Sequence, residues 1–411
     1  MDAVKQEDSV GRASRCFSVV PASQKGPRRH SILFLTPAVT VDTSSGGMLV
    51  TAERLDALTR HHSVSVLTMF VDDAARARFP DVTWHIAGDL RPRNVWSLAK
   101  SHQKRLPLSV WRNSDGALLN RAKELKGNGF DLVYVDHWLM IEAANLVPAT
   151  RRILHLHNAE PEVFFRASER ASLGARWVMQ EEGRRAATYL RAAMRQFDEL
   201  HLLSAEDETA LEARGISHPT TRVFLPSVAG FDRAINGFDD RKDDALFVGT
   251  LSWYANQEGL SWYIDEVLRN LPRPLHHQIV GGGASAALSR KLRATNHLSA
   301  HGYVDDLEPF YQSAKCLVAP LLSGSGIKIK IINALARGLP VVTTSCGIEG
   351  FPLGFGPAIL VQDSPQAFAA SVQRLMSDGV FWHSASQAAL RYFNTHFQGQ
   401  KWAHWAGEVG Q

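Results

Sequence analysis

Short apolar runs alternate with segments of helical apolar spacing along most of the chain. Strands are predicted at 31–36, 63–68 and 131–136, because each is a run of mostly aliphatic residues with turn-forming residues beside it. Residues 48–59 repeat apolar positions every three to four residues, which predicts a helix. The chain therefore opens as strand, loop, helix and strand, the beginning of a doubly wound parallel sheet.

The same alternation continues to residue 226. Further strands are predicted at 82–86, 152–157, 199–204 and 222–226, and helices at 164–197 and 205–214. Residues 227–243 then become polar, glycine-bearing and rich in aspartate, which predicts a linker.

A second α/β unit follows the linker. Its predicted strands are 245–249, 277–283, 298–301, 316–320, 340–344 and 357–361, and its predicted helices are 258–270, 284–294, 306–314, 327–337 and several within 365–411. Two such units in tandem place strand ends and helix N-termini around a cleft, where doubly wound sheets bind ligands. We expect an N-terminal domain at 30–226, a C-terminal domain at 244–385, and helices at 386–411 that pack back on the N-terminal domain.

Composition narrows the class of protein. A chain of 411 residues with 45% hydrophobic and 21% charged residues suits two globular domains. No apolar run approaches the roughly 20 residues that span a bilayer. The polar residues 1–29 are expected to form a disordered leader, not a secretory signal. Three cysteines without metal or disulfide spacing favour a reducing cytoplasm, and nothing indicates a nucleic-acid module.

The segment 316–350 carries the strongest chemical signal. It reads as a strand, a loop of Ser323, Gly324, Ser325 and Gly326, a helix and another strand. Such a loop exposes backbone N–H groups at the positive end of a helix dipole, and Lys328 and Lys330 add charge beside it. Phosphate is the usual anion at such a site, although a plain tight turn is the alternative. The loop does not have the Gly-x-x-x-x-Gly-Lys-Ser/Thr pattern of nucleotide triphosphatases. It does not have the Gly-x-Gly-x-x-Gly pattern of dinucleotide-binding folds either.

Four stretches together resemble a known family. They are "ILFLTP…SSGGMLVTAERLDALTRHHSVSVLT", "LFVGTLSWYANQEGLSWYIDEVL", the "VGGG" after a strand, and "HGYVDDLEPFYQSAKCLVAPLLSGSGIKIKIINALARGLPVVTTSCGIEG". They resemble family 4 glycosyltransferases of the GT-B fold, the glycosyl transferases group 1, over roughly 30–385 and most strongly over 245–350. The resemblance implies two facing Rossmann-like domains, and a metal-independent hexosyl-type transferase that retains anomeric configuration. Its donor would be a UDP- or GDP-linked sugar, with no other cofactor, and its acceptor a glycan, a lipid-linked intermediate or a small molecule.

The resemblance also assigns residues. In the C-terminal domain it implies a donor site made of Gly249, Tyr303, Val304, Gly324, Ser325, Gly326, Ile327, Asn333 and Glu349, with Lys330 and then Lys328 as the cations at the diphosphate. In the N-terminal domain it implies that Gly46 and Gly47 approach the donor phosphates and that His157 faces the reacting sugar. We expect His137, Asn158 and Glu160 to contact the acceptor.

Each of these assignments has a structural alternative. The alternative for His157 is a satisfied polar residue at a strand end, and for His137 and Glu160 it is a helix cap. The alternative for Glu349 is a solvated loop acid. Many members of the family carry glutamates where this chain has Ser325 and Asn333, so the ribose contact of Asn333 would be weaker than that of a carboxylate. A nucleotide-sugar epimerase of the same architecture and a non-catalytic nucleotide-binding subunit are the competing functions.

Two further patterns concern surfaces. Arg184, Arg191 and Arg195 lie at helical spacing, which suits either a peripheral contact with lipid phosphates or a solvated face balanced by Glu181 and Glu182. The tryptophans are expected to pack, and Trp402 and Trp405, at i and i+3, are expected to dock the last helix.

Overall fold

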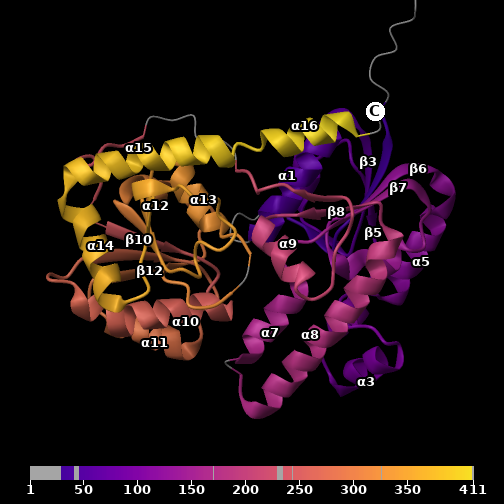
Figure 1. Cartoon of the computed structure of the whole chain (residues 1–411), viewed down its shortest axis with the longest axis horizontal. Coiled ribbons are helices and arrows are strands. Elements are labelled where there is room, and N and C mark those ends of the chain that lie inside the picture. The colour runs from indigo at the N-terminus through magenta and orange to yellow at the C-terminus, as the bar shows by residue number, and fades with distance from the viewer. Residues whose placement is uncertain are drawn as a thin grey trace, which may run out of the picture.

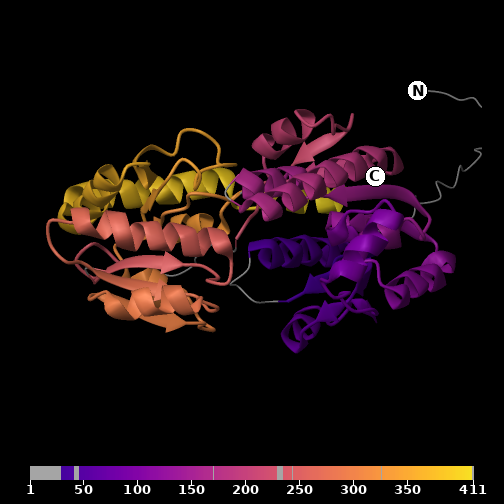
Figure 2. The ribbon, with the colours of Figure 1, turned by 90° about the horizontal axis from the view of Figure 1, so that it is seen from below.

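The computed structural model describes residues 29–40, 46–169, 171–228, 235–242, 244–324 and 326–409. Residues 1–28 of the predicted leader, part of the predicted linker and Ser325 lie outside these ranges. The molecule has two lobes side by side, each built on a parallel sheet, and a long C-terminal helix pair runs along one side of both (Figures 1 and 2). The predicted pair of doubly wound α/β units is confirmed.

The N-terminal lobe contains a parallel sheet of seven strands in the order β5-β3-β1-β6-β7-β8-β9. These strands are β1 (Ser31–Leu35), β3 (Ser63–Thr68), β5 (Thr83–Ile86), β6 (Phe130–Val135), β7 (Ala149–His155), β8 (Glu199–Leu202) and β9 (Thr221–Val223). The short strands β2 (Ala38–Val39) and β4 (Phe70–Val71) pair separately. Strand β1 aligns Ile32 with Val64 of β3 and with Leu132 of β6, which places the carboxyl ends of these strands at one edge.

Helices cover both faces of this sheet. They are α1 (Gly46–His61), α2 (Asp73–Arg78), α3 (Val95–Gln103), α4 (Leu108–Arg112), α5 (Gly116–Glu124), α6 (Ile141–Ala144), α7 (Glu160–Glu169), α8 (Leu173–Ala193) and α9 (Ala205–Glu212), with 3-10 turns η1 (Leu125–Asn128), η2 (Trp138–Met140) and η3 (Met194–Gln196). Strand β1 shows why two layers form: Leu33 and Leu35 enter one core, whereas Ile32 and Phe34 enter the other.

The C-terminal lobe contains six parallel strands in the order β12-β11-β10-β13-β14-β15. Their bounds are β10 (Asp244–Val248), β11 (His276–Val280), β12 (Leu298–Gly302), β13 (Cys316–Ala319), β14 (Val341–Thr343) and β15 (Ile359–Val361). The helices are α10 (Tyr254–Trp262), α11 (Ala286–Ala294), α12 (Glu308–Ser313), α13 (Ile329–Ala336), α14 (Pro365–Ser377), α15 (Gly379–His396) and α16 (Gln400–Glu408), with a π turn η4 (Tyr263–Val267) and 3-10 turns η5 (Leu268–Asn270) and η6 (Gly356–Ala358). No helix within the described part of the chain is long and apolar enough to cross a membrane.

Several helix boundaries differ from those predicted. The single helix predicted at 164–197 is two helices, α7 and α8, and two further differences concern the C-terminal half. Helix α13 begins at Ile329 and not at residue 327, because Ile327 still belongs to the glycine loop and Lys328 is the extended N-cap. Residues 386–396 belong to α15, whose Ala389, Tyr392 and Phe393 pack into the core of the C-terminal lobe. The return to the N-terminal lobe therefore comes at α16, later than the expected residue 386.

Helix α16 docks on the N-terminal lobe through its two tryptophans. Trp402 and Trp405 are buried and stack with ring centroids 4.7 Å apart. The guanidinium of Arg54 on α1 lies 4.5 Å from the centre of the Trp402 ring and donates a hydrogen bond to Phe224 O at 2.8 Å. This confirms the packing role expected for both tryptophans.

The two connections between the lobes touch each other. The chain leaves the N-terminal lobe after β9 and returns between α15 and α16, where Gly399 has a φ of +73°. A Cβ atom at position 399 would collide with the side chain of Ser227 on the outgoing connection. The N–H of Ser227 in turn donates to Glu53 of α1 at 3.1 Å. Only glycine therefore fits where the two connections meet.

We predict that Trp402→Ala lowers the free energy of unfolding by about 3–5 kcal/mol, because it removes a large buried ring and leaves a cavity. Trp96→Ala is the matched control, since Trp96 is 79% exposed, and should change that free energy by less than about 0.5 kcal/mol. Urea unfolding of both variants measures the difference. Equal losses would show that α16 is not anchored by Trp402.

Candidate active site

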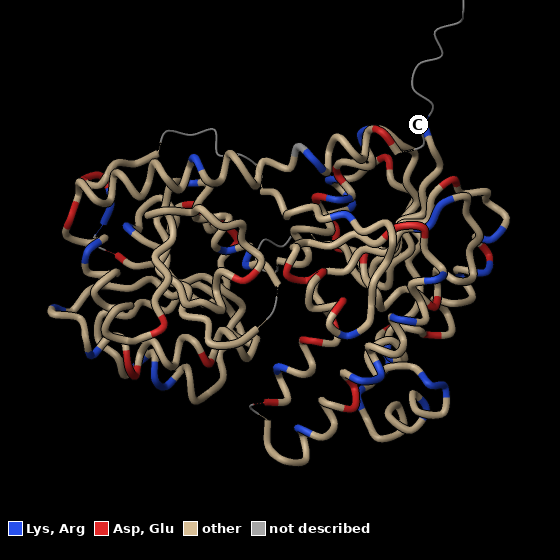
Figure 3. The backbone as a smooth tube through the Cα atoms, viewed as in Figure 1, with Lys and Arg blue, Asp and Glu red and all other residues tan. Residues whose placement is uncertain are grey.

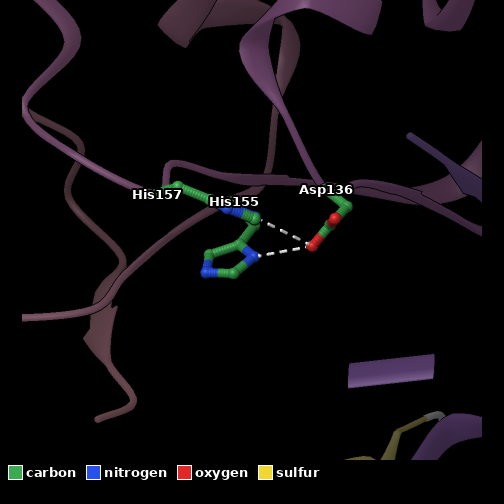
Figure 4. A group of neighbouring side chains, drawn as sticks. All are labelled: Asp136, His155 and His157. Atoms are coloured by element: carbon green, nitrogen blue, oxygen red, sulfur yellow. Dashed lines mark hydrogen bonds and ion pairs between the residues drawn. The ribbon is translucent and has the colours of Figure 1, made fainter. Parts of the chain in front are cut away.

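The carboxyl ends of three strands assemble a buried polar cluster around Asp136. Thr36 follows β1, Asp136 follows β6, and His155 and His157 lie at the end of β7. One carboxylate oxygen of Asp136 accepts from Thr51 Oγ1 of α1 at 2.6 Å and from Thr36 Oγ1 at 3.2 Å. The other oxygen lies 3.0 Å from His155 Nδ1 and 3.3 Å from His157 Nε2 (Figure 4).

The charges within this cluster follow from burial and hydrogen bonding. Burial by itself raises the pKa of Asp136, but nearby His157 and the hydrogen bonds from both histidines outweigh it and hold that pKa well below its ordinary value. Burial lowers the pKa of His155 to about 3, so its ring is neutral at physiological pH. Asp136 is therefore an ionised carboxylate that only accepts hydrogen bonds, and both histidines donate to it.

The cluster fixes the orientation of His157. Its Nε2 lies 3.3 Å from the Asp136 carboxylate, so its Nδ1 is on the side of the ring turned away from that carboxylate. That atom would lie 3.4 Å from a Cβ atom at Gly47, at the start of α1. The predicted residues His157 and Gly47 are thus neighbours, and Nδ1 of His157 lies toward the N-terminus of α1.

The side chains of Asp136, His155 and His157 are also close enough to be considered as metal ligands, because the atoms that could bind an ion all lie within 4.8 Å of one another. The same oxygen and nitrogen atoms are joined by hydrogen bonds in this structure. The geometry is therefore explained by hydrogen bonding.

The residues expected at the acceptor surround the start of α7. Glu160 is the first residue of this helix and is buried, and its Oε1 has no hydrogen-bond partner among the described residues. Burial raises the pKa of Glu160 to about 7. His137 Nε2 lies 3.9 Å from Glu160 Oε1, and burial lowers the pKa of His137 to about 3. The side chain of His137 also accepts a hydrogen bond from Leu139 N at 3.4 Å, so His137 caps the turn η2 as well.

On the opposite lobe, Lys330 lies in the first turn of α13. Its Nζ donates to Asn256 Oδ1 at 2.7 Å, and its burial, followed by the charge of Lys328, lowers its pKa to about 7. A Cβ atom at Gly249, which follows β10, would lie 2.8 Å from that Nζ. Glycine at position 249 therefore makes room for the ammonium group at the carboxyl end of the sheet.

Lys328 has a different position from that expected of a first-turn helix residue. It is the N-cap of α13, only 5% exposed, and its Nζ donates to Gly326 O within the glycine loop. Burial is the main cause that lowers the pKa of Lys328, opposed by Cys346 and Glu349. Lys328 thus holds the loop in place. Ser325, the remaining predicted loop residue, lies outside the described residues.

The loops of the two lobes meet closely at small residues. Gly326 has a φ of +72°, and a Cβ atom there would collide with the side-chain oxygen of Asn158 from the N-terminal lobe. A Cβ atom at Gly46 would lie 2.8 Å from Ile329 Cγ1 at the start of α13. The N-terminus of α1 therefore lies close to the start of α13 across the two lobes.

Sequence reasoning missed Arg166 of α7. Its Nη1 crosses the cleft and donates to Glu349 Oε2 at 2.5 Å and to Gly324 O at 3.1 Å. One N-terminal side chain thus joins both predicted donor loops of the C-terminal lobe. No local pattern marks Arg166 among the many arginines of 164–197, and only its approach to an acid 183 residues away in sequence identifies it.

The remaining predicted donor residues are Tyr303, Val304 and Asn333. Tyr303 is 56% exposed, and Val304 packs against the core of the C-terminal lobe. Asn333 accepts from Arg337 Nη1 at 3.2 Å and lines an interlobe cavity of about 580 Å3. His157, Lys328 and Lys330 are absent from the lining of this cavity. Of the predicted site residues that the structure describes, only Asn333 therefore lines this cavity.

We predict that Asp136→Ala lowers the free energy of unfolding by about 3–5 kcal/mol, because four donors lose a buried charged acceptor. Asp136→Asn keeps the shape and one acceptor oxygen, so the loss should be smaller. Chemical denaturation of the two variants tests this order. A loss below about 0.5 kcal/mol for Asp136→Ala would contradict the role given to the carboxylate.

Comparisons with known proteins agree with this architecture. Residues 242–378 match the family model of glycosyl transferases group 1. Over 347 residues the chain is 24% identical to an uncharacterized 44.6 kDa protein in the cps region of Klebsiella pneumoniae, a match that spans 80% of this chain and 86% of that protein.

Solved structures extend the likeness to the whole chain. Sucrose-phosphate synthase from Thermosynechococcus elongatus has a TM-score of 0.68 at 17% identity, over 93% of this chain and 98% of that one. Anabaena HepE in complex with UDP-glucose has a TM-score of 0.64 at 14% identity, over 93% of this chain and 99% of that one. The C-terminal lobe therefore matches the group 1 glycosyltransferases, and the whole chain has the GT-B fold.

Proposed function

We propose that the protein is a family 4 enzyme that transfers a hexosyl group from a UDP- or GDP-linked sugar, with retention of anomeric configuration and without a bound metal. The observation that carries the proposal is the convergence of Lys330, the glycine loop and the His157–Gly47 pair between the lobes. The likeness to Anabaena HepE, whose structure contains UDP-glucose, favours a UDP-linked donor. The acceptor is a glycan, a lipid-linked intermediate or a small molecule held by the N-terminal lobe.

Lys330 is the main cation for the leaving diphosphate. Sugar transfer develops negative charge on the departing phosphate, and placing cations and N–H dipoles against it is usually the largest catalytic contribution. The ammonium group of Lys330 has three donors, of which Asn256 takes one, so two remain for phosphate oxygens. The N-termini of α1 and α13 point their positive ends at the same place. Lys328 contributes mainly by fixing Gly326.

The N-terminal lobe orients the sugar and the acceptor. His157, held by Asp136, presents Nδ1 to a hydroxyl of the donor sugar. Asn158 and Glu160, which follow it in the chain, would contact the acceptor together with His137. The pKa of Glu160 is about 7, which is close to physiological pH. Its carboxyl group is therefore suited both to donating and to accepting a proton.

The nucleoside would lie toward the cavity that Asn333 lines. Arg337 donates a hydrogen bond to the side-chain carbonyl of Asn333. The side-chain N–H groups of Asn333 would therefore be the ones to contact a ribose oxygen. The backbone at Tyr303 and Val304 would contact the base. Asparagine in place of a carboxylate is also the feature that favours a non-catalytic subunit, so turnover has to be measured directly.

The test is release of free nucleoside diphosphate from a panel of nucleotide sugars, with and without acceptors. We expect release that depends on an acceptor, and Lys330→Ala should lower kcat/KM by about a hundredfold or more, the usual cost of one such donor. Lys291→Ala, on the surface helix α11, is the matched control and should leave kcat/KM unchanged. Formation of an epimer, or binding without turnover, would contradict sugar transfer and support one of the two competing functions.

We predict that kcat/KM falls as pH rises through about 7. The protonated form of Lys330 binds the diphosphate, and its lowered pKa in the free enzyme means that this form is present below about 7 and lost above it. In Lys330→Arg the side chain keeps its charge, so the remaining activity should persist to higher pH. An identical pH profile for that variant would exclude Lys330 as the titrating group.

A further inference from the structure

Exposed apolar side chains gather on one edge of the N-terminal lobe. Of the thirteen large hydrophobic residues that are exposed in the described part of the chain, six lie in or beside α3 and at the start of α8: Leu90, Val95, Trp96, Leu173, Trp177 and Val178. The two helices are joined, because Arg185 Nη2 of α8 donates to Ser101 Oγ of α3 at 3.2 Å. Both lie along the lower edge of this lobe in Figure 1.

Helix α3 buries its polar side and exposes apolar side chains, which is the reverse of an ordinary surface helix. Its buried residues are Ser97 and Ser101, whereas Val95 and Trp96 are 80% and 79% exposed. A helix that only packed on its own protein would bury the tryptophan and expose the serines. The apolar side of α3 therefore faces outward, where nothing in the described chain covers it.

The charge of the segment that contains α3 has one sign. Between Asp89 and Asp115 the chain has no aspartate or glutamate but has six basic residues: Arg91, Arg93, Lys100, Lys104, Arg105 and Arg112. Four of these are exposed, namely Arg93, Lys100, Lys104 and Arg105. The tube through α3 accordingly carries blue and no red in Figure 3. Outward tryptophan and aliphatic groups among lysines and arginines are the composition of an element that lies in a membrane interface.

We propose that this edge, α3 with residues 90–105 and the start of α8, docks the N-terminal lobe on an anionic membrane surface. A second copy of the chain is the less suitable occupant, because pairing two such edges would bring like charges together. The arginine face of α8, expected from the sequence, is a poorer candidate: Arg184 pairs with Glu181 at 3.5 Å, and Arg191 Nε donates to Gly215 O at 3.1 Å.

Docking at this edge would place the acceptor side of the cleft nearest the lipid. If the proposed sugar transfer is correct, a lipid-linked acceptor could then reach α7 and its neighbours without leaving the membrane. This last step rests on the proposed function, whereas vesicle binding does not, so the two can fail separately.

The experiment is flotation of the full chain with two kinds of vesicle, phosphatidylcholine alone and phosphatidylcholine mixed with phosphatidylglycerol. We expect binding to the mixed vesicles, weakened by high salt, and little binding to the neutral ones. Lys100→Glu with Lys104→Glu should weaken binding by about tenfold or more, because each basic residue near an anionic surface raises binding about fivefold. Trp96→Ser with Trp177→Ser should also weaken it.

Arg290→Glu with Arg293→Glu on α11 is the matched control, since it makes the same change of charge on exposed residues of the other lobe. Thermal unfolding midpoints equal to that of the wild type show that each variant is folded. Absence of binding to the mixed vesicles would overturn the proposal, and so would equal weakening by the control pair. Concentration-dependent dimerisation that Trp96→Ser abolishes would overturn it as well, in favour of a second copy.

Discussion

The N-terminal side of the cleft depends on one buried negative charge. Asp136 accepts hydrogen bonds from the loop after β1, from α1 and from two histidines at the end of β7. Four separate segments are thereby held at the carboxyl edge of one sheet. A buried carboxylate is costly unless every oxygen is satisfied, and here the satisfying groups are the ones that border the cleft. The orientation of His157 is therefore a product of how the sheet ends are fastened together.

The C-terminal side depends on small residues and on cations with few partners. Gly249 leaves space for the Lys330 ammonium, and Gly326 lets the loop pass against Asn158. Lys328 satisfies a carbonyl within the loop, while Lys330 keeps donors available. The two lysines, two residues apart, thus have different surroundings: Lys328 is bonded within the loop, and Lys330 is bonded to Asn256 near the end of β10.

Most of the fold could be predicted from the sequence, because buried strands and helices leave regular apolar spacing. Strand 63–68 is observed with the predicted bounds, and the glycine loop separates a strand from a helix as expected. The start of α13 was placed two residues early, since Ile327 is apolar and fits the helical spacing although the backbone there is still loop. Arg166 and the fourfold role of Asp136 could not be predicted, because both depend on partners brought close only by the tertiary fold. The outward side of α3 was missed for a related reason, since apolar spacing does not state which side a helix buries.

The contact between Gly399 and Ser227 brings the outgoing and returning connections together at one place. Gly399 also has a φ of +73°, a backbone conformation that side chains other than glycine rarely adopt. A larger residue at position 399 would therefore strain the backbone and press on the other connection at the same time, so one small residue constrains both passages of the chain between the lobes.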